Sequence, residues 1–296
     1  MYGTVIASAI AMFRNIFSRR LTEKATQITV KSKGMFSSGM EGSGEDMCSH
    51  ARAAAQKRRA QAQADVHAKD AGHDHIKTHF AEAYNKVALK ASSRGDPRIA
   101  SLLMTKLGYT ENEMLVIGDD ANYMQGTGNP HIAANIQAGE TVVDLGSGFG
   151  IDSFIAASKT GSDGTVIGVD ISAGEVEYAS QRAVQRGINE IVKFVEGDIE
   201  DLPLQGKIAD CVLSNGGFCL VPNKKVAFEE IFRILKPGGR MAICCTTNKV
   251  ALDANVDWPV CMNVFMQMDV IKPLLASIGF KDVDVDLSNS RMDLWD

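Results

Sequence analysis

The feature that most constrains this chain is residues 141–150, TVVDLGSGFG. An apolar run compatible with a β-strand precedes a loop with glycine at every second position, which is typical of a buried parallel strand that turns directly into a helix. Because glycine has no Cβ, backbone N–H groups of such a loop can close around a ligand. Asp144 would repel a phosphate, and Gly146, Gly148 and Gly150 depart from the G-x-G-x-x-G spacing of dinucleotide-binding loops. The loop therefore favours a ligand that is cationic or carries an amino group.

Strand-like and helix-like segments alternate from residue 141 onward. Strands are predicted at residues 141–145, 165–170, 192–196, 208–214, 240–246 and 280–287, helices at 151–160, 174–187, 223–235 and about 264–278, and a turn at LKPGGR before residue 240. This alternation, with short glycine-bearing connections, predicts an α/β fold: a doubly wound, mainly parallel, Rossmann-like sheet with helices on both faces. Ligands of such sheets bind at the carboxyl ends of the strands. Residues that directly follow strands are therefore the candidates for a site.

Polar residues do follow successive predicted strands. Asp170 ends the second strand and can accept both hydroxyls of a ribose, whereas Asp198 and the backbone of Ile199 follow the third and can bind an adenine edge. Ser214 and Asn215 lie at the end of the fourth strand. The carboxylates Asp144, Asp170 and Asp198 at the ends of successive strands favour S-adenosylmethionine over a nicotinamide cofactor. The residues predicted to bind this cofactor are Asp144, Gly146, Ser147, Gly148, Gly150, Asp170, Ile171, Asp198, Ile199, Ser214 and Asn215.

The N-terminal quarter of the chain has a different composition. Residues 1–40 carry six Lys and Arg side chains against Glu23 alone, residues 34–50 are rich in Gly and Ser, and residues 51–69 are rich in Ala, Gln and Arg. We assign residues 1–72 to a basic, low-complexity extension that resembles an organellar, most closely mitochondrial, transit peptide followed by a linker. A basic tail without fixed structure is the alternative, which would leave the protein in the cytoplasm.

Three further segments follow this extension. Residues 73–130 are predicted to form an N-terminal helical lid, with apolar residues at helical spacing over 76–89, a second helix ending near Leu107, and Thr110 capping a short third one. Residues 131–250 are the predicted cofactor-binding core, and residues 251–296 a short C-terminal helix and strand. Few residues remain after the strand at 280–287, so we expect the last strand, which would close the sheet as a β-hairpin with it, to be stunted or missing. The resulting open sheet edge, like the N-terminal extension, is a candidate surface for protein partners.

Composition excludes several classes of function. The net charge of −5 argues against general nucleic-acid binding, and the apolar run at residues 5–13 is far too short to span a membrane. The six cysteines show no disulfide spacing and are typical of small buried side chains in a reducing compartment. His75 and His79 have a spacing that can hold a metal ion, but no further ligand completes a set. We therefore predict no metal site.

Several strings of this sequence resemble arsenite methyltransferases. They are residues 128–172, which begin GNPHIAANIQAGE, together with GDIEDLP, SNGGFCLVPNKK, FRILKPGGR, LGYTENEM and DDANYMQGTGNP. The resemblance covers about residues 76–279. It implies a class I methyltransferase fold, S-adenosylmethionine as methyl donor, and direct displacement of the methyl group onto a small-molecule acceptor. Tyr84 falls where that family has a Tyr-Gly pair on a lid helix, so it is a candidate substrate residue. No residue is identified as a catalytic base.

The chain departs from this family at its cysteines. The family has one cysteine before the Gly-Asn-Pro turn and another after the Ser-Asn pair, and these positions are Thr127 and Gly216 here. A third family cysteine matches Cys261, and Cys219 lies close to the second position, so these two thiols are further substrate candidates. Packing among its neighbours is the alternative role of Cys219. Thiolates are the natural ligands of As(III), so their loss implies an acceptor other than arsenite.

Two other functions are compatible with these observations. The first is a structural or assembly subunit of an organellar complex that keeps the methyltransferase fold with little or no catalysis. The second is a lipid or quinone methyltransferase, which shares the cofactor motifs but does not account for the GNP and LGYTENEM segments.

Overall fold

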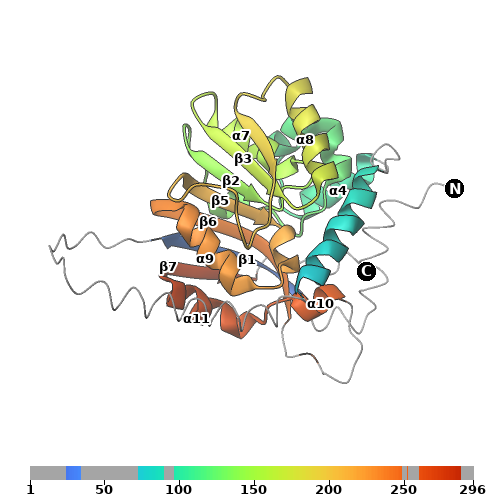
Figure 1. Cartoon of the computed structure of the whole chain (residues 1–296). Coiled ribbons are helices and arrows are strands. Elements are labelled where there is room, and N and C mark those ends of the chain that lie inside the picture. Colours follow the sequence, from blue (N-terminus) through green and yellow to red (C-terminus); the bar gives the residue numbers. More distant parts are fainter. Residues whose placement is uncertain (1–24, 35–72, 90–96, 249–251, 253–259, 288–296) are drawn as a thin grey trace.

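The computed structural model of this chain describes residues 25–34, 73–89, 97–248, 252 and 260–287 (Figure 1). The described elements are β1 (Ala25–Gly34), a helix at residues 73–89, α4 (Pro97–Lys106), α5 (Glu111–Ile117), η1 (Gly118–Tyr123), α6 (His131–Ala134), β2 (Thr141–Leu145), α7 (Ile151–Thr160), β3 (Thr165–Asp170), α8 (Ala173–Gln185), β4 (Val192–Glu196), β5 (Ala209–Asn215), η2 (Gly217–Leu220), α9 (Lys224–Ile234), β6 (Leu235–Asn248), α10 (Val260–Val264), α11 (Met268–Ile278) and β7 (Phe280–Asp286).

These strands form a seven-stranded sheet in the order β4-β3-β2-β5-β6-β1-β7. The five strands from β4 to β6 are parallel, and β1 pairs antiparallel with both β6 and β7. The predicted doubly wound, mainly parallel α/β fold is therefore confirmed. The chain passes from β2 outward to β3 and β4 and then returns to β5 on the other side of β2. The carboxyl ends of β2 and β5 consequently flank the point at which the strand order reverses, where ligands of such sheets bind.

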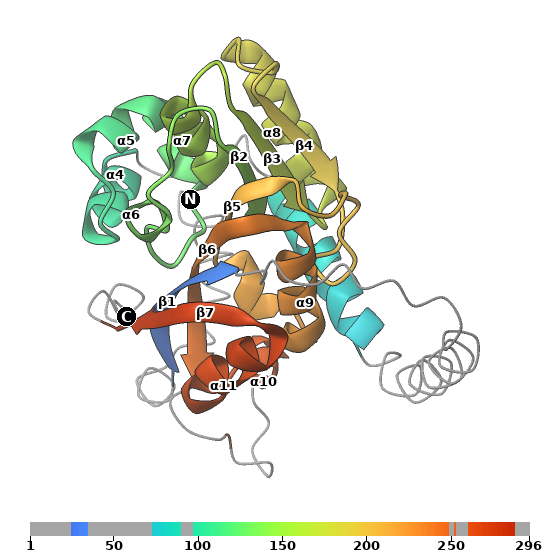
Figure 2. The ribbon, with the colours of Figure 1, turned by 90° about the vertical axis from the view of Figure 1, so that its left-hand side faces the viewer.

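Alternating burial explains the two layers of helices. In β2, Val142 faces the cluster that includes α6 and α7, whereas Val143 and Leu145 face the cluster of α9 and α11. Phe154 of α7 and Phe228 of α9 fill the two sides of the sheet and are almost fully buried. Figure 2 shows α4, α5 and α6 gathered beside α7, apart from α10 and α11 near β7. Both faces of the parallel strands are thus covered, as a sheet of this kind requires.

The helix at residues 73–89, drawn in cyan in Figure 1, packs across the carboxyl ends of β3 and β4. Lys77 Nζ lies 2.7 Å from both Asp198 Oδ2 and Glu200 Oε2. Near the other end of the helix, Asn85 Oδ1 accepts hydrogen bonds from Ser172 Oγ and from the backbone N–H of Gly174. The helix predicted at residues 76–89 is therefore present, and both of its ends are tied to the edge of the sheet where the cofactor site was predicted.

The predicted cap at Thr110 is also present. Thr110 Oγ1 accepts a hydrogen bond from the backbone N–H of Glu113, and Glu113 Oε2 accepts one from the backbone N–H of Thr110. This reciprocal capping box satisfies two N–H groups that would otherwise lack partners at the start of α5. Lys159 of α7 donates to the other oxygen of Glu113 over 2.6 Å, which anchors α5 to the core.

The edge of the sheet beyond β6 differs from prediction. Residues 25–34, which we assigned to the N-terminal extension, form β1, and β1 runs between β6 and β7. Its short alternation around Ile28 and Val30 is a weak strand signal, and its pairing partners lie more than 200 residues away in sequence. The strand predicted at 280–287 is present as β7 and pairs with β1 along Thr29–Gly34, whereas any further strand after it would lie outside the described residues.

Two boundaries differ in detail. The helix predicted at about 264–278 is divided into α10 and α11, with Gln267 in an extended conformation before α11. The predicted LKPGGR turn belongs to an irregular first part of β6, where Gly238 has a φ of 80° and the pairing register with β5 shifts. Among the residues that the structure describes, no helix combines the length and apolar character needed to cross a membrane.

Candidate functional site

A cavity opens at the carboxyl ends of β2, β3, β4 and β5, against the helix at residues 73–89. Its wall combines the loops after these strands with the segment that follows η1. The lining includes Asp144, Gly146, Ser147, Gly148, Asp170, Ile171, Asp198, Ile199 and Asn215 from the predicted cofactor set, together with Lys77, Phe80, Tyr84, Gln125, Thr127, Asp152, Glu175 and Leu220. Nine of the eleven predicted cofactor residues thus meet at one cavity.

The glycine loop forms the floor of this cavity. The backbone N–H groups of Gly146 and Ser147 both donate to Val169 O, over 2.8 and 3.1 Å, which ties the loop to β3. A Cβ on Gly146 would lie 2.8 Å from the Gly217 backbone, so only glycine lets the ends of β2 and β5 approach this closely. Ser147 Oγ is buried without a hydrogen-bond partner among the described residues. Ser147 lines the cavity as a residue, while its Oγ lies against Gly168 of β3.

Asp170 links the end of β3 to this loop. One carboxylate oxygen accepts from the backbone N–H of Gly148 and the other from that of Ser172, each over 2.8 Å. The side chain is buried, and burial raises its pKa despite these hydrogen bonds. Each carboxylate oxygen keeps a second lone pair, so Asp170 can also accept hydrogen bonds from a ligand's hydroxyl groups.

Asp144 is the most deeply buried acid of the cavity wall, with 1% of its surface exposed. Its Oδ2 accepts a hydrogen bond of 2.6 Å from Ser153 Oγ. Burial, followed by the repulsion of the nearby Asp152 carboxylate, raises the pKa of Asp144 to about 8. A carboxyl group in such surroundings gains most from a cationic ligand, because a positive charge would stabilise its ionised form. This fits the cationic or amino-bearing ligand that the sequence predicts.

Asn215, at the end of β5, belongs to a buried polar network. Its Nδ2 lies 2.9 Å from Tyr109 Oη, 3.0 Å from Asp152 Oδ2 and 2.8 Å from Gly128 O. Its Oδ1 accepts from the backbone N–H groups of Thr127 and Gly128. Asn215 therefore fixes the 126–128 turn against the cavity. Burial and then Asp152 raise the pKa of Tyr109 well above its usual value, so this phenol remains a hydrogen-bond donor.

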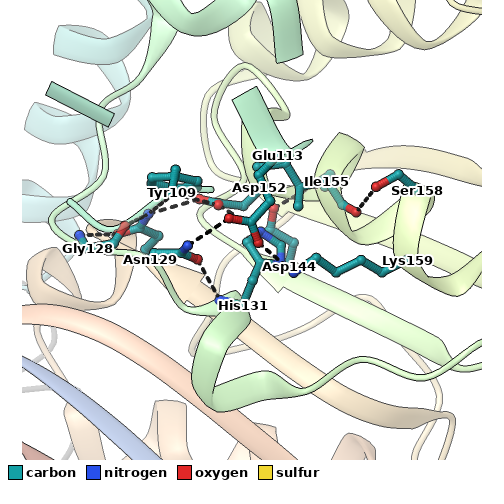
Figure 3. Close-up of polar contacts among 12 residues, drawn as sticks. Tyr109, Glu113, Gly128, Asn129, His131, Asp144, Asp152, Ile155, Ser158 and Lys159 are labelled. Carbon is teal, nitrogen blue, oxygen red and sulfur yellow. Dashed lines mark hydrogen bonds and ion pairs between the residues drawn. The ribbon is translucent and has the colours of Figure 1, made fainter. Parts of the chain in front are cut away.

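Asp152, in the first turn of α7, is the centre of the network (Figure 3). Its Oδ1 accepts from Tyr109 Oη over 2.7 Å and lies 3.0 Å from His131 Nε2. Asp152 thus joins α7 to the segment before β2 and keeps its carboxylate at the cavity wall. The sequence offered a signal for this residue, because an acid in the first helical turn after the glycine loop lies at a helix N-terminus beside the ligand. We did not predict Asp152 or His131 as site residues, although Asp152 lies only two residues after the predicted loop.

Asp198 and Tyr84 both line the cavity. Asp198 Oδ2 pairs with Lys77, while its Oδ1 accepts from the backbone N–H of Glu200 over 2.9 Å. Tyr84 lines the cavity from the helix at residues 73–89, and burial, with Glu175 next, raises the pKa of its phenol. Ile171 and Ile199 also line the wall and offer apolar surface for an adenine ring.

Two predicted cofactor residues lie away from the wall. Gly150 has a φ of 85°, and a Cβ there would stand 2.6 Å from the Phe194 ring, so its role is close packing. Ser214 Oγ donates to Leu145 O over 2.7 Å and accepts from the backbone N–H of Phe218. These bonds hold β5 to β2 and to η2. Both residues therefore support the site from behind, which their position in the motif could not distinguish from ligand contact.

The two candidate substrate cysteines do not line the cavity. The Cys219 thiol is buried and donates to Gly216 O, and Cys261 is buried in the cluster with α9 and α11. Burial raises the pKa of both thiols, which keeps them protonated. Thr127 and Gly216, where the resembling family has cysteines, are neighbours: a Cβ on Gly216 would stand 3.8 Å from Thr127 Cγ2. The chain thus carries no thiol at either of these adjacent positions. No group of three His, Cys, Asp or Glu side chains within the described ranges could hold a metal ion.

Comparison with known proteins was consistent with this geometry. Residues 136–270 match a family described as "Methyltransferase domain". The chain is 34% identical over 199 residues to an arsenite methyltransferase of Halobacterium salinarum, an alignment that covers 64% of this chain and 51% of that protein. It is 31% identical over 110 residues to the ubiquinone/menaquinone biosynthesis C-methyltransferase UbiE of Xylella fastidiosa, covering 37% and 44%.

Among solved structures, the arsenic(III) S-adenosylmethionine methyltransferase CrArsM of Chlamydomonas reinhardtii matches with 27% identity and a TM-score of 0.48, covering 62% of each chain. The chain spans about half the length of the curated relatives it matches.

Proposed function

We propose that this chain transfers the methyl group of S-adenosylmethionine to a small-molecule acceptor by direct displacement, which its match to a methyltransferase domain family and its similarity to an arsenite methyltransferase support. The observation that carries this proposal is the cradle in which Asp170 binds the N–H groups of Gly148 and Ser172 at the carboxyl end of β3. Such a cradle places a carboxylate and a glycine backbone side by side at the switch point of the sheet. A nucleoside with a positively charged tail needs both features.

Each part of the donor has a matching part of the cavity. The Ile171 and Ile199 side chains and the Asp198 carboxylate suit the adenine, Asp170 suits the ribose, and Asp144 suits the charged amino acid end. Bound there, S-adenosylmethionine supplies an electrophilic methyl carbon on its sulfonium sulfur. The chain's own residues bind, orient and shield this group.

The acceptor would approach from the side of the 73–89 helix and the 126–128 turn. Phe80, Tyr84, Thr127 and Leu220 line this part of the wall, and their surface is largely apolar. Holding the nucleophile in line with the methyl carbon and sulfur can contribute roughly 7–11 kcal/mol, so a base is not required when the acceptor is already nucleophilic. Asn215 Oδ1 accepts hydrogen bonds from the backbone of the 126–128 turn and so fixes the position of this turn, which bounds the space for the acceptor.

Arsenite is not the acceptor we propose, although the Halobacterium relative is named for it. As(III) binds thiolates strongly, and the adjacent positions Thr127 and Gly216 provide none at the cavity. Cys219 and Cys261 stay protonated and turned away from it. We expect no methylated arsenic when the protein is incubated with arsenite, S-adenosylmethionine and a thiol reductant, measured by liquid chromatography with arsenic detection. Catalytic formation of methylarsenic species would overturn this part of the proposal.

Calorimetric titration with S-adenosylmethionine tests the proposal directly. The wild-type protein should bind the donor, and Asp170→Asn should weaken binding at least tenfold because the amide cannot accept at both positions. Asp163→Asn is the matched control, because Asp163 is an exposed acid in the turn before β3. Absence of binding heat at millimolar donor with the folded wild-type protein would overturn the enzymatic proposal and favour a non-catalytic subunit with a methyltransferase fold.

A further inference from the structure

Glu175 lies at the third position of α8, in the sequence Ser172-Ala-Gly-Glu, which matches the pattern of a capping box. Half of the box is formed, since Ser172 Oγ accepts from the backbone N–H of Glu175 over 3.3 Å. The other half is not, because the backbone N–H of Ser172 donates to Asp170 instead. In α5, by contrast, Glu113 completes the equivalent box. The Glu175 carboxyl group is thus released from the role that its position predicts.

The released carboxyl group turns into the donor cavity. Glu175 is only 2% exposed and lines the cavity wall between Asp170 and Tyr84. Its Oε1 accepts a hydrogen bond of 2.9 Å from Gln125 Nε2. Its Oε2 has no hydrogen-bond partner among the described residues, and it is the atom nearest to where a Cβ on Gly148 would stand, at 3.6 Å. One oxygen is therefore held in place while the other faces the glycine loop.

Burial of this group is costly without a partner. Desolvation and then the neighbouring Asp170 carboxylate raise the pKa of Glu175 well above its usual value, with only the Gln125 hydrogen bond opposing them. A Met or Leu side chain could fill this space without that cost. Buried acids with an unused oxygen at a cavity wall are characteristic of ligand sites. The missing partner would then arrive with the ligand.

We propose that Glu175 is a ribose-binding residue of the donor site, which contacts one hydroxyl group through Oε2 while Asp170 contacts the other. This assignment rests on the proposed function. Both Asp170 oxygens already accept a backbone N–H, so a ribose edge finds only their remaining lone pairs. A protonated Glu175 supplies what Asp170 lacks, namely an O–H donor toward a hydroxyl oxygen. Gln125 fixes Oε1 and thereby aims Oε2 at the glycine loop.

The test compares ligands that differ by one hydroxyl group. S-adenosylhomocysteine and its 2′-deoxy and 3′-deoxy analogues are titrated into the wild-type protein and into Glu175→Met, Glu175→Leu and Glu175→Gln. Glu177→Gln is the matched control, since Glu177 is an exposed acid on the same helix. A site that hydrogen-bonds a hydroxyl rejects the analogue that lacks it, so the wild-type and control proteins should bind each deoxy analogue at least tenfold more weakly.

For each protein, the dissociation constant of each deoxy analogue is divided by that of S-adenosylhomocysteine, which gives two ratios. Removal of the Glu175 carboxyl group should abolish one of them. We expect Glu175→Met to bind S-adenosylhomocysteine at least tenfold more weakly, and to bind one deoxy analogue within about threefold of it. The other ratio should persist, because Asp170 is intact. Glu175→Gln, which keeps a donor and an acceptor, should retain most of both ratios. Glu175→Leu repeats the measurement if Glu175→Met does not fold.

The outcomes separate this assignment from the proposed function. Wild-type-like affinity in Glu175→Met, or an equal loss for all three ligands, would overturn the assignment alone, because an equal loss indicates a packing role. Absence of binding by the folded wild-type protein would overturn the proposed function and the assignment together.

Discussion

At the scale of single residues, Asp144 is the acid that we expect to contribute most to the affinity for the positively charged methyl donor. Its carboxyl group is buried, accepts from Ser153 Oγ, and has a pKa raised to about 8 by burial and by Asp152. Asp144→Asn keeps a hydrogen-bond acceptor for Ser153 but removes the negative charge. We expect binding of S-adenosylmethionine to weaken about ten- to hundredfold, since hydrogen bonds to charged groups contribute roughly 1.5–3 kcal/mol.

Calorimetry on Asp144→Asn checks this expectation, with S-adenosylhomocysteine as the comparison ligand that lacks the sulfonium charge. Ser153→Ala is the matched variant, because it removes only the hydrogen bond to Asp144. A loss confined to Ser153→Ala, with Asp144→Asn unchanged, would show that the charge of Asp144 does not contribute to donor binding.

The sequence identified residues whose role follows from their place at a strand end. Asp144, Asp170 and Asp198 were found because a carboxyl end of a parallel strand is a ligand position regardless of the rest of the fold. Glu175 and Gln125 could not be found in this way. Glu175 matches a capping box, and only the structure shows that the backbone N–H of Ser172 donates to Asp170 instead of to Glu175. Gln125 meets Glu175 across 50 residues of sequence, a distance over which residue spacing predicts nothing.

At the scale of elements, β1 is the strand that the sequence could not assign. Ala25–Gly34 pairs with β6 on one side and with β7 on the other. Pairing on two edges is a property of the assembled sheet, so a ten-residue segment of mixed polarity carries little trace of it. The consequence is that β7 depends on the N-terminal region, because β1 is the only strand beside it in the described sheet.

Truncation measures this dependence. We expect a variant that begins at Ala25 to keep the thermal stability of the full chain, and one that begins at residue 35 to lose stability or solubility because β7 then has no neighbour. Val30→Pro is the subtler test. Val30 pairs with Ile243 and Val285, and proline removes a ladder hydrogen bond there. A fall in the melting temperature of about 4–8 °C is expected, equivalent to ~2 kcal/mol.

The same strand bears on the proposed organellar targeting. If residues before β1 act as a transit peptide, as we propose, we expect the cut to lie upstream of Ala25, because β1 pairs with both β6 and β7 in the sheet. N-terminal sequencing of the protein purified from its native source checks this, and a mature form that begins after Gly34 would contradict it.

Equal stability of the variants that begin at Ala25 and at residue 35 would show that β1 does not support β7.

At the scale of the whole molecule, the parallel half of the sheet and β7 were predictable, whereas the insertion of β1 between β6 and β7 was not. Strands β2 to β5 are consecutive and joined by short crossovers, so local patterns dictate both their presence and their order. The edge combines β1 from one end of the chain with β7 from the other. The cavity lies within the predictable half at its floor, whereas the 73–89 helix and the 126–128 turn complete it through long-range contacts.

Charge burial in this cavity predicts how the stability of the whole protein depends on pH. The pKa values of Asp144, Asp170 and Glu175 are raised in the folded state, chiefly by burial. Their contribution to stability is complete below the pKa values of the unfolded chain and is lost as the pH rises through their raised folded-state pKa values, of which that of Asp144 is about 8. For Glu113 and Glu140 burial opposes ionisation, but hydrogen bonds from Lys159 and Arg240 outweigh it and lower the pKa. Their contribution is lost instead as the pH falls below about 5.

The donor-free protein should therefore be most stable at about pH 5–6, between these two regions. By pH 8 we expect the free energy of unfolding to fall by ~2 kcal/mol, a decrease in melting temperature of about 4–8 °C. Saturating S-adenosylmethionine should reduce this decrease, because its positive charge favours the ionised acids, whereas S-adenosylhomocysteine should reduce it less. In Asp144→Asn the decrease should be smaller even without ligand, since one of the three acids is gone. Thermal unfolding between pH 5 and 8.5 measures all four conditions. A melting temperature that rises steadily from pH 6 to pH 8 in the donor-free protein would show that these carboxyl groups are already ionised and stabilised, and the cavity would then need a resident cation of its own.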